Sequence, residues 1–470
     1  MEFATDCEDR TRRFKGLTSP TLPMLAALLT LIAFPAFCSA QGAQTPPSDA
    51  NKPAAQVLTL ESAIAEALRS NPGLQAASRQ VEAARKQVNV ARGQLYGELD
   101  AVLTAQHLND AQLLRPMAGP FTPALASTMP FAQDQLHVGF TYTYPLYVGG
   151  RITDQIRIAE LGVDNARERL TGTRWDTIYN VTALYLQAQA LAAQADAVQQ
   201  EIEALDTTRR NLELAVRIGK RPEVDLLKTL DRIEEAQAAK SGVLAQQQKL
   251  LALLMAVLGR NPAEAPALEG LPERLPELST QPPALRDVAL RRSSVRAAEL
   301  AVALDDKQVA VARAALAPAV SFQATFLHHD ELTSFDPGRP TWFVGLQVGL
   351  PVFDGGSRKA AVSRSQQEAE ADRQRAEAAR LQAVADLQAA LAAWQSAQDQ
   401  LRAAEAQYAS AHEVARIEQL RFDTGAGDIE DLLRARSREV AAESARIAAR
   451  AQIAISAAQI NHVTESEVAR

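Results

Sequence analysis

The 470-residue sequence predicts a mostly α-helical protein with a small membrane β-part, built from two copies of one unit. Each copy contains alternating strands, a hinge, a very long helix and a shorter return helix. Three observations predict this fold. The stretch TYTYPLYVGGRITDQIRIAEL at 141–161 recurs as GLQVGLPVFDGGSRKAAVS at 345–363, a long proline-free segment follows each copy, and short segments in both halves alternate in polarity.

The hinge residues repeat in register, 206 positions apart. We expect the proline of each copy to end a strand and the two glycines to let the chain turn into the long helix. The predicted hinge residues are Pro145, Gly149, Gly150, Pro351, Gly355 and Gly356. The next glycines able to end the long helices, Gly219 and Gly425, show the same spacing. Strand, hinge, helix and turn are therefore duplicated together.

Composition favours long helices that pack closely through small side chains. Apolar residues make up 47% of the chain, whereas aromatic residues make up only 5%. The net charge of -7 and the lack of a basic run argue against a nucleic-acid partner. Both cysteines, Cys7 and Cys38, lie in the first 40 residues, so a chain processed beyond them would have no disulfide and no thiolate metal site.

The first 40 residues have the pattern of an export signal. Basic residues at 10–15 precede the apolar run from Leu22 to Phe37, and small residues follow. We expect cleavage after Ala40. The alternative, a lipid-anchored Cys38, fits less well because the bulky Phe37 precedes it. Residues 41–57 then form a flexible leader rich in proline, alanine and serine.

The remaining chain divides into two repeats, predicted at 58–262 and 284–462, with a Pro-rich linker at 263–283 and a C-terminal tail at 463–470. In the first repeat, Thr59 is expected to cap a helix, and the helical pattern resumes after Pro72 up to about Leu95. A single helix from Ala284 to about Ala315 is expected to open the second repeat.

Four segments alternate as strands, at 99–106, 136–146, 319–327 and 342–350. A half-buried sheet in a soluble α+β protein is one interpretation. Three features favour a membrane sheet instead: a length of about 9–11 residues, a small uncharged polar face and the absence of a recognisable membrane helix in an exported chain. Four strands cannot close a barrel, which needs about eight, so neighbouring protomers are expected to complete it.

The long helices are predicted at 151–218 and 357–424, 68 residues each, with a length of roughly 100 Å. The second carries an apolar stripe with spacings of three and four: Leu387, Ala390, Trp394, Ala397, Leu401, Ala404, Tyr408, Ala411 and Ala415. The first carries the equivalent stripe over 181–205. Such a stripe indicates coiled-coil packing rather than a cofactor site. The return helices are expected at 222–258 and from 428 to about 460.

Several motifs together resemble the TolC-like outer-membrane efflux protein family. In chain order they are LTLESAIAEALRSNP, YPLYVGGR, AVRIGKRPEVDLLKTLDRI, LPVFDGGSR and LRFDTGAGDIEDLLRARSRE, and the resemblance extends from about Leu58 to Asn461. The resemblance implies a homotrimer in which twelve strands form an outer-membrane β-barrel that continues as a periplasmic α-helical barrel. It also implies contact with a periplasmic adaptor (membrane fusion) protein and, indirectly, with an inner-membrane pump of the RND or ABC type.

By the same resemblance, the two far turns are the working end. The residues matching adaptor-contacting turns are Arg217, Gly219, Asp225, Arg421 and Gly425. The residues matching the periplasmic entrance gate are Asp431, Asp428, Glu430, Arg434 and Phe422. Arg434 stands where an acidic residue is expected, so we expect an entrance that is acidic but less cation-selective. The alternative is a solvated helix surface with i,i+4 ion pairs.

His328, His329 and Asp330 form the only tight sequence cluster of metal-ligand types, and we assign no metal or cofactor to it because a third ligand at suitable spacing is missing. No phosphate loop or nucleophile elbow is present in the sequence, so we expect no enzyme. The leading function is a passive exit duct of a tripartite efflux or type I secretion system. The alternatives are a soluble periplasmic coiled-coil adaptor or scaffold, and an exported enzyme.

Overall fold

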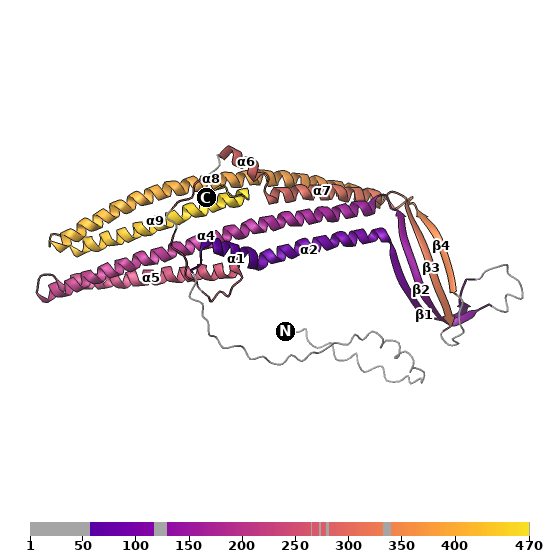
Figure 1. Ribbon diagram of the computed structural model, residues 1–470, viewed down its shortest axis with the longest axis horizontal. Coiled ribbons are helices and arrows are strands. Elements are labelled where there is room, and N and C mark those ends of the chain that lie inside the picture. The colour runs from indigo at the N-terminus through magenta and orange to yellow at the C-terminus, as the bar shows by residue number, and fades with distance from the viewer. Residues whose placement is uncertain are drawn as a thin grey trace, which may run out of the picture. The chain divides into compact units, whose positions relative to one another are not determined.

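The computed structural model describes residues 57–116, 129–264, 266–271, 274–278, 282–331 and 340–469. The predicted signal peptide and all but the last residue of the predicted leader lie outside these residues, as do parts of the linker and of two loops. Figure 1 shows the arrangement of the helices and strands described below.

Apart from the short 3₁₀ helix η1 of the first half, the two halves of the chain contain the same elements in the same order. The first half contains α1 (Leu60–Ser70), α2 (Pro72–Gly93), η1 (Gln94–Tyr96), β1 (Glu98–Leu113), β2 (Phe131–Tyr147), α4 (Arg151–Arg217) and α5 (Glu223–Leu258). The second contains α6 (Pro282–Ala289), α7 (Ser293–Ala314), β3 (Ala319–Glu331), β4 (Pro340–Gly349), α8 (Ser357–Asp423) and α9 (Ile429–Thr464). Both long helices have 67 residues and both return helices have 36, so the predicted duplication is confirmed.

Helix α4 lies at the centre of the helical part. It packs against α2 and α7, which lead into the strands, and against α5 and α9, which return from the far turns (Figure 1). The stripe on α8 is core, as predicted: Leu387, Trp394 and Leu401 are buried with Ile453 and Ile460 of α9. Alanines between these large residues let the helix axes approach closely, as in a coiled coil.

The helices that precede each pair of strands begin in different ways. Thr59 caps α1, because its side chain accepts a hydrogen bond from the Ser62 amide. The expected single helix over 284–315 is wrong, since the chain breaks between α6 and α7. Glu465, which follows α9, caps the start of α7. Its carboxylate accepts hydrogen bonds of 2.7 Å from Ser293 N and 2.5 Å from Ser293 Oγ. A cap 172 residues away leaves no local sequence signal.

The four strands form one antiparallel sheet in the order β1-β2-β3-β4. The strands of the first half are longer than expected, at 16 and 17 residues. The prediction that Pro145 ends its strand is wrong: Pro145 lies inside β2, paired with Ser321, and the register shifts between it and Tyr147. An irregularity in the ladder accommodates a residue that has no amide proton. In the second half β4 ends at Gly349, before Pro351, as predicted.

The strand register gathers apolar side chains on one face of the sheet. Phe140 pairs with Phe326 across β2 and β3, and Phe326 pairs with Trp342 of β4. These side chains are exposed, at 56%, 47% and 72% of their surface. The opposite face carries mainly small or polar residues such as Gly139, Thr141 and Thr325. An apolar face of this extent indicates contact with lipid or with another protein.

The glycine hinges have the same backbone in both halves. Gly149 and Gly150 have φ of 65° and 85°, and Gly355 and Gly356 have φ of 66° and 87°. These left-handed conformations suit glycine and turn the chain from the sheet into the long helix. Gly150 and Gly356 are the N-cap residues of α4 and α8.

One described helix, α5, is long and apolar enough to cross a membrane by length and composition, with a mean hydropathy of 1.3 over its most apolar 18 residues. The expectation from the sequence was that no such helix is present. The apolar residues Leu254, Met255 and Leu258 of α5 are fully buried against Tyr185 of α4 and the start of α1. Packing in the helical core thus accounts for these three residues, whereas only 22% of the apolar 18-residue window is buried.

The two glycine hinges allow the energetic cost of backbone strain to be separated from the cost of overpacking, by comparing one Gly→Ala variant in each hinge. We expect Gly149→Ala to destabilise the protein by about 2–5 kcal/mol, because the left-handed backbone costs about 1–2 kcal/mol and overpacking about 1–3 kcal/mol more. The added Cβ would lie 2.8 Å from Ala317 Cβ. Gly355→Ala is the control: no atom lies within 4 Å of its Cβ position, so only the strain remains. Thermal unfolding followed by circular dichroism measures both, and equal midpoints would contradict the packing contribution.

Candidate functional site

The two helical hairpins end in turns at the end of the helices away from the sheet (Figure 1). Gly219 and Gly425 hold the left-handed conformation in these turns, with φ of 75° and 79°. Both glycines are exposed, and no atom lies within 4 Å of a Cβ built on either. Arg217 and Arg421, the last basic residues of α4 and α8, are also exposed. These four predicted turn residues therefore lie on open surface.

A small apolar cluster joins the two hairpins near their turns. Leu212 of α4, Phe422 of α8 and Ile429 and Leu432 of α9 are buried together, with Leu226 of α5 packed against them. The predicted gate residue Phe422 is thus 8% exposed and faces the cluster instead of an open lining. Its side chain holds the hairpins together, because it packs between elements from both halves of the chain.

Arg221 of the first turn forms polar contacts with the second turn. Its Nη2 donates hydrogen bonds to Phe422 O at 3.2 Å and to Gly427 O at 3.3 Å. Its guanidinium also lies 4.5 Å from the centre of the Phe422 ring, a cation–π distance. The carboxylate of Asp225 lies 3.9 Å from Arg221 Nη1 and is almost fully buried. Asp225, predicted to face an adaptor, instead supports Arg221.

Arg221 was not among the predicted turn residues, although the sequence contains a signal for it. At the 206-residue spacing its counterpart is Gly427, the residue whose carbonyl it binds. The two turns differ at this position, and that difference allows one turn to bind the other. Arg221 and Gly427 occupy equivalent positions in the two repeats but differ in residue type, and this pair forms a contact between the repeats.

The predicted acidic gate residues form ion pairs on the exposed start of α9. Arg434 donates to Glu430 at 2.9 Å and to Asp431 at 3.4 Å, and Lys228 of α5 donates to Glu430 at 3.1 Å. Asp428 is the N-cap of α9, with its carboxylate 3.5 Å from the Glu430 amide. The i,i+4 pairing considered in the sequence analysis is present between Glu430 and Arg434. Basic partners therefore offset part of the negative charge at this turn, although solvent screens such exposed pairs.

Apolar side chains are also exposed near both turns. Leu214, Ile218 and Leu227 of the first hairpin are 58%, 66% and 57% exposed, and Leu420 of the second is 58% exposed. Several large apolar residues at one end of a helical hairpin are typical of a protein–protein contact surface. The turns thus combine flexible glycines, charges of both signs and apolar area.

A buried ion pair connects α4 to α5. Arg232 Nη2 donates to Glu201 Oε1 at 2.8 Å, and Arg232 Nη1 donates to Glu235 Oε2 at 2.6 Å. Burial raises the pKa of Glu201, and the bonds from Arg232 act in the opposite direction. A buried carboxylate of this kind depends on its partner to stay charged, so Glu201 and Arg232 form one structural unit. No pattern in the sequence indicated this pair.

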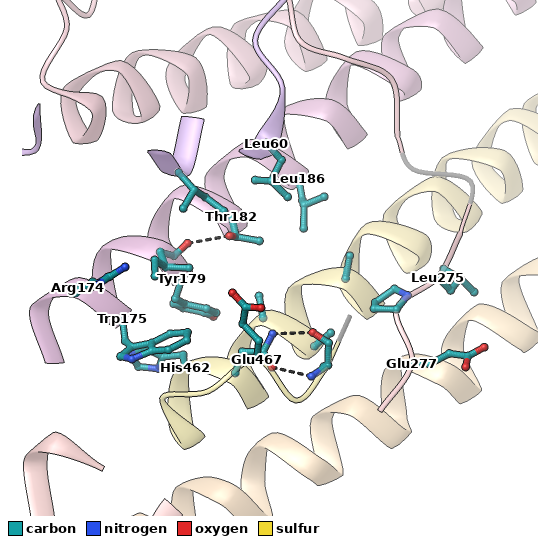
Figure 2. Close-up of a pocket in the computed structure, with 18 of the residues that line it drawn as sticks. Leu60, Arg174, Trp175, Tyr179, Thr182, Leu186, Leu275, Glu277, His462 and Glu467 are labelled. Carbon is teal, nitrogen blue, oxygen red and sulfur yellow. Dashed lines mark hydrogen bonds between the residues drawn. The ribbon is translucent and has the colours of Figure 1, made fainter. Parts of the chain in front are cut away.

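A cavity of about 1120 Å³ lies where α1, α4, α9, residues 274–277 of the linker and the C-terminal residues meet (Figure 2). Tyr179 stacks on His462 at 5.1 Å, and His462 Nε2 lies 2.7 Å from Asp176 Oδ1. Asn461 holds the chain end, since its Oδ1 accepts bonds from the amides of Val468 and Ala469. The lining contains none of the predicted turn or gate residues and forms a junction between the two halves.

The predicted histidine cluster separates across the sheet. His328 pairs with Val138 and His329 pairs with His137, so the two adjacent histidines lie on opposite faces of β3. Among the described residues, no group of three or more His, Cys, Asp or Glu side chains could hold a metal ion. His329 clusters with its chain neighbours in the sequence, whereas in the structure it lies against His137.

The chain matches the family "Outer membrane efflux protein" over residues 63–260 and 284–464. It is 25% identical over 320 residues to Protein CyaE of Bordetella pertussis, covering 67% of each chain, and 24% identical over 302 residues to outer membrane protein OprJ of Pseudomonas aeruginosa, covering 63% and 61%. Matches to two Pseudomonas putida efflux pump outer membrane proteins cover 47% of those chains. The aligned region thus spans about half to two thirds of these relatives.

Solved structures extend the fold comparison over more of the chain. The Campylobacter jejuni CmeC outer membrane channel aligns with a TM-score of 0.75 and 17% identity, covering 87% of this chain and 86% of that one. The open state of the Neisseria gonorrhoeae MtrE outer membrane channel aligns with a TM-score of 0.69 and 23% identity, covering 87% and 89%. The fold is therefore that of TolC-like outer-membrane channels.

The family match covers most of the sequence, and the chain belongs to the outer membrane efflux protein family. It is accordingly an outer-membrane protein of a Gram-negative bacterium. The predicted family, fold class and location are confirmed.

The contact between the two turns can be tested through Arg221. Replacing it by Met keeps apolar packing on Phe422 but removes two bonds from a charged donor, each worth about 1.5–3 kcal/mol. We expect the amides of Ala426 and Gly427, which bond to Arg421 O, to exchange hydrogen at least about tenfold faster. Arg217→Met, an exposed arginine at the end of α4, is the control and should leave exchange unchanged. Equal exchange in both variants would show that Arg221 does not hold the turns together.

Proposed function

We propose that the protein is the passive outer-membrane exit duct of a tripartite efflux or type I secretion system. It conducts substrates that an inner-membrane pump and a periplasmic adaptor deliver. The observation that carries this proposal is the sheet with one exposed apolar face joined by glycine hinges to helices of 67 residues. A soluble periplasmic coiled-coil scaffold, the alternative, would use the helices but has no need for that apolar face.

In this proposal three protomers assemble into one channel. The four strands leave β1 and β4 as edges, and exposed strand edges are completed by pairing. Three copies supply twelve strands, enough for a barrel with a water-filled interior. The apolar face then contacts lipid, and the face with Gly139, Thr141 and Thr325 lines the lumen. The helices continue the barrel into the periplasm.

The two turns serve as the periplasmic entrance and as the docking surface for the adaptor. Exposed Gly219 and Gly425 permit close approach of a partner, and the apolar residues beside them supply contact area. Asp431, Glu430 and Asp428 line the entrance with Arg434, which reduces its net negative charge. Phe422, Asp225 and Arg221 act beneath this surface by holding the hairpins together.

The relatives' names fit a partner-driven system. Two relatives from Pseudomonas putida are described as a probable efflux pump outer membrane protein and a toluene efflux pump outer membrane protein. We infer that this chain likewise works with an adaptor and with an RND or ABC-type pump. Energy then comes from the pump, and the channel itself needs no catalysis and no cofactor.

Ion selectivity tests the acidic entrance. We expect the purified protein to form small cation-selective channels in a planar bilayer. Removing one charge at a narrow entrance changes ion energy by on the order of 1 kcal/mol, about fivefold in occupancy. Asp431→Asn should therefore lower the cation-to-anion permeability ratio. Arg434→Gln should raise it, because it frees Asp431 and leaves Glu430 paired with Lys228 alone.

Three other outcomes would change the proposal. Openings with unaltered selectivity in both variants would keep the channel and remove the gate role of Asp431. Absence of conductance from trimeric protein would favour the scaffold. Recovery of the wild-type protein in a salt-washed soluble fraction would also favour the scaffold, since a membrane-spanning sheet stays with the membrane.

A further inference from the structure

Two histidines from different halves of the chain face each other on the polar face of the sheet. His137 of β2 and His329 of β3 are directly opposite in the strand register. Their Nδ1 atoms are 2.8 Å apart, and the ring centroids are 4.8 Å apart in an edge-to-face arrangement. His329 is 6% exposed, so its ring is held in place by its neighbours.

The distance between the two nitrogens matches a particular coordination geometry. A histidine nitrogen binds a first-row metal ion at about 2.0 Å. Two such nitrogens in adjacent positions of a square-planar or tetragonal site are then about 2.8 Å apart, whereas a tetrahedral site needs about 3.3 Å. The observed separation is that of a hydrogen bond between the two rings, and it also allows both nitrogens to bind one ion in the first geometry, which Cu²⁺ and Ni²⁺ prefer.

Thr341 of β4 supports the protonation state that such a site needs. Without metal, at most one proton lies between the two Nδ1 atoms, because one nitrogen donates and the other accepts. A metal bound at both Nδ1 atoms requires each ring to carry its proton on Nε2. His329 Nε2 lies 2.6 Å from Thr341 Oγ1, which can accept that proton in a hydrogen bond. A partner of this kind fixes the ring orientation and tautomer of a metal ligand.

We propose that His137 and His329 bind one Cu²⁺ or Ni²⁺ ion through their Nδ1 atoms, with Thr341 as a positioning residue and water in the remaining positions. The ion connects β2 of the first half to β3 of the second, in the part of the sheet away from the helices. The protein supplies two ligands only, because no group of three or more candidate ligands is present among the described residues. It does not depend on whether the protein conducts.

The test is a titration of the full-length protein, without a histidine tag, with CuSO₄ and separately with NiCl₂. We expect Cu²⁺ to give an electron paramagnetic resonance signal with electron spin-echo modulation from two imidazoles. His137→Asn and His329→Asn should each leave one imidazole and weaken binding at least about tenfold, since even the loss of an outer partner costs 10–100-fold. Thr341→Val should weaken binding about 10–100-fold with both imidazoles still coordinated.

The matched control is His328→Asn, which removes the neighbouring histidine on the opposite face of β3. This variant should retain the wild-type affinity and both imidazole signals. Equal loss in His328→Asn and His329→Asn, or unchanged binding in all variants, would overturn the proposal by identifying an adventitious surface site. A shift in the thermal unfolding temperature on adding Cu²⁺ gives a second readout, expected in the wild type and in His328→Asn but not in His137→Asn.

Discussion

The packing of small side chains between long antiparallel helices supports every other feature of this structure. Alanines such as Ala390 and Ala397 of α8 are fully or almost fully buried and alternate with Leu387 and Trp394 along the contact with α9. Helix propensity alone gives only marginal stability to an isolated helix, so this continuous contact is what keeps 67 residues helical. Because the helices are rigid, they hold the sheet at one end and the two turns at the other.

The same helices create surfaces that one chain leaves uncovered. The sheet exposes an apolar face and two edges, and the turns expose further apolar side chains. A different kind of contact would cover each of these surfaces. Lipid hydrocarbon suits the uniform apolar face, and pairing with another strand suits the sheet edges. A partner helix suits the turns, which expose both apolar and charged side chains. The proposed assembly in the outer membrane, with further copies and partners, explains the three together, which a soluble scaffold does not.

The most informative positions are those where the two repeats differ. Arg221 binds the carbonyl of Gly427, its counterpart in the other repeat, and His137 meets His329 across the seam between the halves. Duplication builds two equivalent hairpins, but equivalence alone gives no specific contact between them. Substitutions in one copy supply such contacts. Pro145, inside its strand, shows the same divergence, since its counterpart Pro351 lies outside β4.

The sequence by itself determined most of the elements and their order, but not the break between α6 and α7. Periodicities of two and of three to four residues, the paired glycines and the 206-residue spacing are local or repeated signals, and they predicted the strands, hinges and long helices. Only the tertiary structure decided which side chains meet. Glu465 caps α7 and Arg232 pairs with Glu201 across helices, and Phe422 is buried instead of exposed. Such contacts depend on the relative rotation and axial position of the packed elements. Many weak interactions together set these positions, so no single residue carries a sequence pattern that predicts them.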